Sequence, residues 1–344
     1  RNSFGNPDLK WEKTIQADAG FDLSLFNNRI EVIADYYHKT TKDLLLDAPI
    51  PYSSGLETVT KNIGSIRNQG LELTLNTHNV KNKNFNWYTN LSWSMNRNKV
   101  LKLGVNDEDI FPGPYQGGEI TVLRVGKPIG AFWGKVRMGT WGESEIEEAK
   151  KYERLPGDLK YKDLNNDGTI DSDDQCQVGF PTRPNYTFGL NLSADYKGFF
   201  FAMNWTGAAE RSISLTDMFR KPFMGESRGL MQYQVDGRWT PETASTAKYP
   251  RFSKNSGEYN SYNSDMWIVD GSYIKLKDVS VGYNFNDRPA LKKLGISQLG
   301  VKLTGYNLLC FSPFDLMDPE FVIGWQNTKY PVTRIYNLGV NITF

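Results

Sequence analysis

The residues best suited to chemistry form one acidic loop at 163–174, with the sequence DLNNDGTIDSDD. Its oxygen-bearing side chains follow the spacing of calcium loops, in which positions 1, 3, 5 and 9 surround the ion and a glycine, here Gly168, makes the sharp turn. The seventh position adds a backbone carbonyl, and the twelfth carries Asp in place of the bidentate Glu of an EF-hand. The expected ligands are Asp163, Asn165, Asp167, Thr169, Asp171 and Asp174.

This spacing predicts a structural calcium ion that holds a long loop in shape. The shorter carboxylate at position 12 reaches less far than Glu, which favours weak binding. The alternative interpretation is a series of Asx turns that bind no ion.

A second candidate set lies in the Tyr-rich segment 249–267. Aromatic rings stack on sugars and peptides, and a guanidinium donates hydrogen bonds to them. The candidates for substrate binding are Arg251, Tyr259, Tyr262 and Trp267. The alternative is that these aromatic residues pack one loop against another.

Enzyme motifs are missing from the sequence. It contains no GxSxG, HExxH, P-loop or GxGxxG pattern, and we interpret its two histidines, His38 and His78, as exposed polar residues. No catalytic residue is therefore expected. The formal net charge of +1 combines 40 basic and 39 acidic residues without a Lys/Arg block, which argues against a nucleic-acid partner.

The elements that would position these loops are long alternating strands. Aromatic residues make up 13% of the chain, mean hydropathy is -0.52, and no run approaches the roughly 18 apolar residues of a membrane helix. Residues 185–197 alternate apolar with polar side chains, the pattern of a transmembrane barrel strand. Similar patterns predict nine strands, at about 11–26, 29–46, 63–79, 85–99, 185–197, 198–210, 271–286, 297–310 and 331–344.

Short and long connections alternate between these strands, which is typical of an outer-membrane barrel with its long loops outside. The short ones are 27–28, 81–84, 197–198 and 287–296; the long ones are 47–62, 100–184, 211–270 and 311–330. The strand-like segment 120–138 would break this alternation, so we assign it to the external loop 100–184, together with a helix at Glu145–Glu153 capped by Ser144 and Glu147.

Nine strands are an odd number, whereas a bacterial antiparallel barrel closes with an even one. The sequence therefore predicts an all-β transmembrane antiparallel barrel of which residues 1–344 supply only a portion. A soluble β-sandwich is the alternative fold, but its turns recur every eight to twelve residues.

The final strand ends on an aromatic residue, as does the signal by which the outer-membrane assembly machinery recognises a last barrel strand. We expect this role for Tyr336, Leu338, Val340, Ile342 and Phe344.

Several blocks resemble the SusC/RagA family of TonB-dependent outer-membrane transporters along nearly the whole chain. They are 5–12 (GNPDLKWE), 62–66 (NIGSI), 68–72 (NQGLE), 157–161 (GDLKY), 238–241 (RWTP), 318–320 (DPE) and the terminal strand.

The resemblance implies that the chain is the C-terminal portion of a 22-stranded, plugged barrel that imports oligosaccharides or peptides. It also implies coupling to TonB through an N-terminal plug domain that this sequence does not contain, a SusD-like surface lipoprotein as a lid, and outer-membrane lipids around the barrel. The alternative is a plugless surface barrel with an adhesive or structural role, which the sequence upstream of Arg1 would distinguish.

Overall fold

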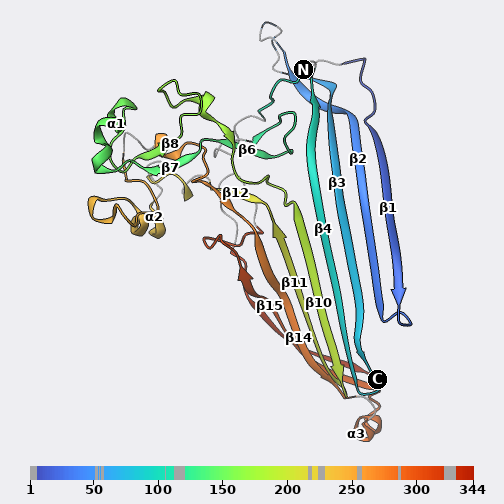
Figure 1. The fold of residues 1–344 in the computed structure, drawn as a ribbon. Helices are drawn as coiled ribbons and strands as arrows, with labels where there is room; N and C mark the ends of the chain where they lie inside the picture. Colours follow the sequence, from blue (N-terminus) through green and yellow to red (C-terminus); the bar gives the residue numbers. More distant parts are fainter. Residues whose placement is uncertain are drawn as a thin grey trace.

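Nine long strands form one antiparallel sheet in sequential order (Figure 1). The computed structural model describes residues 6–50, 53, 55, 58–104, 106–111, 121–215, 219–223, 229–253, 258–285, 288–320 and 331–344. The strands of the large sheet are β1 (Lys13–Leu25), β2 (Ile30–Pro49), β3 (Thr58–Lys81), β4 (Phe85–Leu103), β10 (Tyr186–Tyr196), β11 (Phe199–Ala209), β14 (Tyr273–Asn284), β15 (Gln298–Phe311) and β16 (Ile335–Thr343). Each of the nine predicted segments overlaps one of these strands, but β2, β3, β4 and β15 extend beyond the predicted ends.

The connections have the predicted polarity. In Figure 1 the short turns lie at the lower end of the sheet and the long connections lie at the other end. The turn between β1 and β2 places Phe26, Asn27 and Asn28 at φ of 53°, 55° and 61°, a left-handed conformation that Asn tolerates better than most residues. The link between β14 and β15 holds the short helix α3 (Pro289–Lys293).

A β-bulge interrupts β14. Asn204 of β11 lies opposite Asp278, but its neighbour Trp205 lies opposite Leu276, so Lys277 is an extra residue in β14. A residue inserted in this way changes the face on which the following side chains lie. Lys275 and Asp278 consequently lie on the same face of the sheet.

The two longest connections fold into an external module, which we define as the described residues of 121–185 and 210–272. Its strands pair in three small sheets and not in the large one, as expected for 120–138. The strands are β5 (Thr121–Val122), β6 (Ala131–Gly134), β7 (Arg137–Thr140), β8 (Leu159–Tyr161), β9 (Cys176–Gln177), β12 (Ser212–Ser214) and β13 (Ile268–Asp270). The helices are η2 (Glu143–Glu145), α1 (Ile146–Lys151), η3 (Ser172–Asp174), α2 (Gln232–Gly237), η5 (Pro241–Thr243) and η6 (Tyr259–Ser261).

The predicted helix at 145–153 exists, but its predicted cap is wrong. The helical segment begins two residues earlier, at Glu143 in η2, and continues into α1. The backbone N–H of Gly142 donates to Oε2 of Glu145 over 3.0 Å, and neither Ser144 nor Glu147 caps the segment. Glu145 also pairs with Lys160 over 2.8 Å, a contact across the module that local sequence does not reveal.

Most buried apolar side chains lie in the external module or pack against it, whereas a few, such as Val100 and Leu276, lie in the large sheet. One cluster joins five buried side chains, Ile213, Leu215, Phe219, Trp267 and Phe314. A second contains Phe132, Val178 and Ile268, and a third Leu159, Tyr161 and Tyr259. No helix among the described residues is both long and apolar enough to span a membrane.

Candidate functional site

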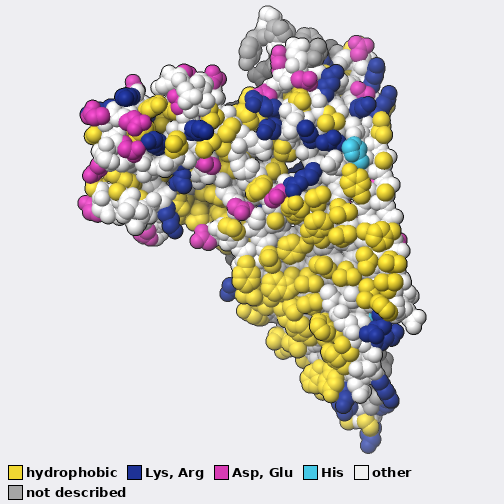
Figure 2. Space-filling model, viewed as in Figure 1, with side chains coloured by type: hydrophobic (Ala, Val, Ile, Leu, Met, Phe, Trp, Pro, Cys, Tyr) yellow, Lys and Arg dark blue, Asp and Glu magenta, His cyan; other side chains and the backbone are white. Residues whose placement is uncertain are grey.

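The large sheet has one apolar and one polar face. On β10, Leu190 lies opposite Leu91 and Trp205, whereas the next residue, Asn191, lies opposite Asn90 and Asn204. Figure 2 shows the outer face, where hydrophobic side chains gather in a broad band over the strands and Lys and Arg side chains lie near the short turns. Because apolar side chains are stable in lipid and amides are not, the polar face is the luminal one.

Small polar side chains line the upper part of this luminal wall. A hollow of about 400 Å³ there is lined by Glu72, Thr74, Ser92, Thr187, Gly189 and Thr206 among others. Short side chains leave space beside the wall, so this surface suits contact with something that fills or crosses the lumen.

Two of the predicted substrate residues are buried in the external module. Trp267 is 2% exposed and donates its Nε1–H to the backbone oxygen of Asn260 over 2.9 Å. Tyr259 is 4% exposed, and the guanidinium of Arg154 lies 3.8 Å from its ring centre. Burial raises the pKa of Tyr259 to about 12. Packing accounts for both positions.

The other two differ in accessibility. Arg251 forms an ion pair with the fully buried Asp158, with 2.8 Å between Nε and Oδ1. Tyr262 is 38% exposed, and its ring stacks on Tyr161 at 6.2 Å between centres. Tyr262 is therefore the candidate whose ring a substrate could reach, and substrate binding by the set stays a prediction.

A pocket beside Arg251 and Trp267 is too small for a nutrient. It has a volume of about 20 Å³ and is also lined by Arg220, Gln234 and Tyr249. This volume accommodates one or two water molecules. Large substrates must bind elsewhere.

Two of the family-like blocks meet inside the module. Gly157 has a φ of +85°, and a Cβ added there would lie 2.4 Å from the ring of Trp239. Its carbonyl accepts the N–H of Arg251 over 2.8 Å. The blocks GDLKY and RWTP therefore contribute to packing, since only Gly allows this backbone conformation and this close approach without strain.

The predicted calcium loop is closed by its own backbone. Asp163 accepts the N–H groups of Asn166 and Gly168 over 2.6 and 2.9 Å, and Asp167 accepts that of Thr169 over 2.8 Å. Gly168 has a φ of +84°, as the predicted turn requires. The loop thus adopts Asx-type turns at the predicted positions.

The end of that loop is buried. Asp174, 0% exposed, accepts the N–H of Leu164 over 2.7 Å and that of Asp171 over 2.9 Å. Lys135, which the sequence analysis missed, is 3% exposed and donates its ammonium to the carbonyl of Asp171. Burial lowers the pKa of Lys135, and the negative charges of Asp174 and Asp171 oppose that shift.

These contacts leave calcium as an untested prediction. Among the described residues, no three His, Cys, Asp or Glu side chains gather as a metal site would require. Asn165 also donates to Asp167 over 2.8 Å and accepts its N–H over 3.1 Å. Calcium binding would require carboxylate oxygens of Asp163, Asp167 and Asp171 to converge on one ion.

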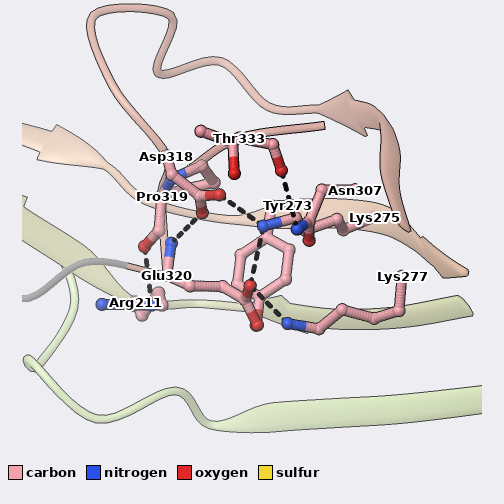
Figure 3. A network of polar contacts seen from close by, with 9 residues as sticks. All are labelled: Arg211, Tyr273, Lys275, Lys277, Asn307, Asp318, Pro319, Glu320 and Thr333. Carbon is pink, nitrogen blue, oxygen red and sulfur yellow. Dashed lines mark hydrogen bonds and ion pairs between the residues drawn. The ribbon is translucent and has the colours of Figure 1, made fainter. Parts of the chain in front are cut away.

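A polar network, also missed by the sequence analysis, fixes the connection after β15 to the upper part of β14 (Figure 3). Lys275, 3% exposed, contacts the carboxylate of Asp318 and lies 2.9 Å from Glu320, which Lys277 also approaches at 2.6 Å. Arg211 donates to the carbonyl of Pro319 over 2.9 Å. The DPE block therefore anchors an external connection to the barrel wall.

The assembly role of the last strand stays a prediction. Tyr336, Leu338, Val340 and Ile342 alternate on the apolar face of β16, which pairs with β15 alone among the described strands. All four are exposed, as is Phe344 just after the strand.

Comparisons with known proteins support the same fold. Residues 1–308 match the family model described as TonB dependent receptor-like, beta-barrel. TonB-dependent receptor P26 of Formosa agariphila is 36% identical over 98% of this chain, and TonB-dependent receptor SusC of Bacteroides thetaiotaomicron is 26% identical over 98%. The chain spans only 35% and 32% of those relatives.

A solved structure shows the same architecture. The structure of the RagAB peptide transporter superposes with a TM-score of 0.80 at 23% identity, covering 99% of this chain and 36% of the matched one. At this identity the likeness establishes the fold, and the nine-stranded sheet is one part of a larger barrel.

Proposed function

The chain belongs to the family of TonB-dependent receptor-like β-barrels of the outer membrane, and from that premise we propose that the complete protein imports a nutrient. The observation that supports import most directly is the two-faced sheet, with amides and small polar side chains toward the lumen and apolar ones toward lipid. We propose that the protein acts as a transporter and not as an enzyme, in line with the family to which it belongs.

The cargo class we propose is an oligosaccharide or a peptide. The solved relative is described as a peptide transporter, and SusC is the more distant of the two curated relatives. The wide, hydrogen-bonding luminal wall suits either cargo, because both carry many donors and acceptors.

We propose two partners for the complete protein. TonB would act through a plug domain in the part of the protein that precedes this sequence. A SusD-like surface lipoprotein would close the barrel from outside, where the external module offers an ordered surface built on its own buried core. Purification of the tagged full-length protein should recover such a lipoprotein, and a deletion of the module residues should abolish its recovery.

An uptake assay tests the function. Cells that carry the full-length gene, a deletion, or the gene under TonB depletion would receive labelled oligosaccharides and labelled peptides. Import should need both the gene and TonB. Surface attachment that survives TonB depletion, without uptake of either cargo, would instead support the adhesive or structural barrel.

A further inference from the structure

A continuous row of polar side chains crosses six strands of the luminal wall. Cross-strand register places its members directly opposite one another from β2 to β14. The row consists of Glu31, Asn76, Asn90, Asn191, Asn204 and Asp278. Four amides in line between two carboxylates form an ordered chain of hydrogen bonds.

The carboxylates at the two ends determine which way each amide points. Asn76 donates Nδ2 to Glu31 over 2.7 Å, and Asn204 donates Nδ2 to both oxygens of Asp278 over 3.0 Å. Ionised carboxylates only accept hydrogen bonds, so both amides must turn their nitrogen outward along the row. Their oxygens then face the centre of the row.

The central pair inherits this orientation. Asn90 donates to Oδ1 of Asn76, and Asn191 donates to Oδ1 of Asn204. In each half of the row, every Nδ2 therefore donates to the next residue toward the carboxylate at that end. The two halves meet where β4 pairs with β10. Within the described part of the chain, Oδ1 of Asn90 and Oδ1 of Asn191 accept no hydrogen bond. Two neighbouring acceptors cannot satisfy each other, so both stay open to water or to a ligand donor with several N–H or O–H groups.

The surroundings of the pair favour a cationic donor. A groove of about 440 Å³ contains Asn90, Asn191, Glu31 and the ring of Tyr88, which is 42% exposed. The ring of His78 stacks on that of Tyr88 at 4.2 Å and holds it in place. A carboxylate, two carbonyl oxygens and an aromatic face together suit a planar guanidinium, which donates several N–H bonds and stacks on rings.

The charge of the adjoining wall points the same way. Asp35 of β2 lies directly opposite Glu72 of β3, and Asp22 of β1 lies one luminal row closer to the groove. Like charges placed opposite each other destabilise a sheet. No basic side chain among the described residues forms an ion pair with any of the three. A passing cation would therefore relieve repulsion as well as bind.

We propose that Asn90 and Asn191, with Glu31 and Tyr88, form a luminal subsite for the guanidinium or ammonium group of a peptide cargo. This inference rests on the proposed import function and selects basic peptides as its cargo. The subsite lies five residues from the short-turn ends of β4, β10 and β11, so cargo would reach it late in its passage.

Uptake of two matched peptides tests the subsite in cells that carry the full-length protein. The probes are one labelled peptide with a single arginine and the same peptide with citrulline, which keeps the shape and removes the charge. The wild-type protein should import the arginine peptide about fivefold faster, since charged donors form the stronger hydrogen bonds. Asn90→Leu with Asn191→Leu should bring the ratio near one, and Glu31→Gln should lower it partly.

A control variant separates the acceptor pair from general polarity. Thr74→Val with Ser92→Ala removes two polar groups from the next luminal row and should keep the arginine preference. Heat-modifiable migration would confirm that every variant forms a barrel. Import of both peptides without preference, or a preference that survives Asn90→Leu with Asn191→Leu, would overturn the subsite alone. Import of neither peptide by an assembled wild-type barrel would remove basic peptides as cargo, and oligosaccharide uptake would then decide the proposed function separately.

Discussion

None of the 11 residues of the interior strand β10 is buried, whereas Phe132, Leu159 and Trp267 of the external module are at most 2% exposed. The large sheet keeps its side chains on its two surfaces, where lipid and the lumen surround them. The module buries apolar side chains against one another, as a water-soluble domain does. Two different sources of stability therefore meet in one chain.

This difference separates the two regions energetically. Backbone hydrogen bonds between strands and the surrounding lipid stabilise the sheet, because no water competes for its peptide groups there. The module depends on the hydrophobic effect in water and on a few buried ion pairs. Substitutions in the module core should loosen the module without unfolding the barrel. Substitutions on the lipid face should destabilise the barrel without loosening the module.

The largest effect is expected at Trp267. Replacement by Ala removes the centre of a buried cluster and a hydrogen bond, and should cost the module about 3–5 kcal/mol. Limited proteolysis should then cut within 210–272 while heat-modifiable migration still reports a barrel. Trp87→Ala, on the exposed apolar face of β4, is the matched control and should leave the module protected. A Trp267→Ala protein with no barrel at all would refute the separation.

The lipid face of the sheet comes next. Leu192→Arg near the middle of β10 should destabilise the barrel by roughly 2–4 kcal/mol, whereas Ser193→Arg on the luminal face should be tolerated. Folding in lipid vesicles across a urea series would measure both. Equal losses at the two positions would contradict the assignment of the faces.

The anchor in Figure 3 should matter less, because it joins the two regions at one point. Asp318→Ala leaves the buried Lys275 with Glu320 as its remaining partner and should cost about 1–3 kcal/mol. Hydrogen exchange should quicken in residues 312–320 and hardly change in β14. Asp315→Ala, an exposed carboxylate in the same connection, is the control.

Calcium is predicted to act on the module alone. At a calcium concentration about ten times its Kd, binding would stabilise the loop by about 1.4 kcal/mol. Cleavage within 157–180 should slow with calcium but not with magnesium, and Asp163→Ala with Asp167→Ala should abolish the effect. Asp173→Ala should retain it, since Asp173 is not a predicted ligand. If calcium changes neither cleavage nor melting of the wild-type protein, the loop is only a turn.

The smallest effect on stability is expected at Phe344. Phe344→Asp should slow assembly into the outer membrane and leave the assembled barrel within about 0.5 kcal/mol of wild type, as is usual for an exposed position. Pulse-chase labelling would follow the heat-modifiable fraction, with Thr343→Ser as the control. An unchanged rate of assembly would contradict the predicted role of Phe344 in the assembly signal.

The sheet could be predicted because its side chains repeat a period of two over long stretches. The sequence alone indicates the face on which Leu190, Asn191 and Leu192 lie, because the polarity of each side chain matches its own surroundings and does not depend on a distant partner. The alternation of short and long connections then fixed the strand count and moved 121–138 out of the sheet.

The module and the luminal row could not be predicted in this way. Asp158 and Arg251 are 93 residues apart, and Asn90 and Asn191 are 101 positions apart, so no local pattern joins them. The helix cap failed only partly for this reason, because Glu145 accepts the N–H of Gly142 three residues away and pairs with Lys160, which is 15 residues away. Long-range packing and register decide these contacts.

The bulge at Lys277 bears on how this region can change during evolution. Beyond it, every β14 side chain lies on the face opposite to the one that simple alternation from Lys275 would give. Deletion of Lys277 would therefore move either Lys275 onto the lipid face or Asp278 out of the luminal row. Evolution can replace one residue type by another here in small steps, but it cannot change the length of the strand in this way. Any homologue with a one-residue gap at this point must have rebuilt the anchor or the row.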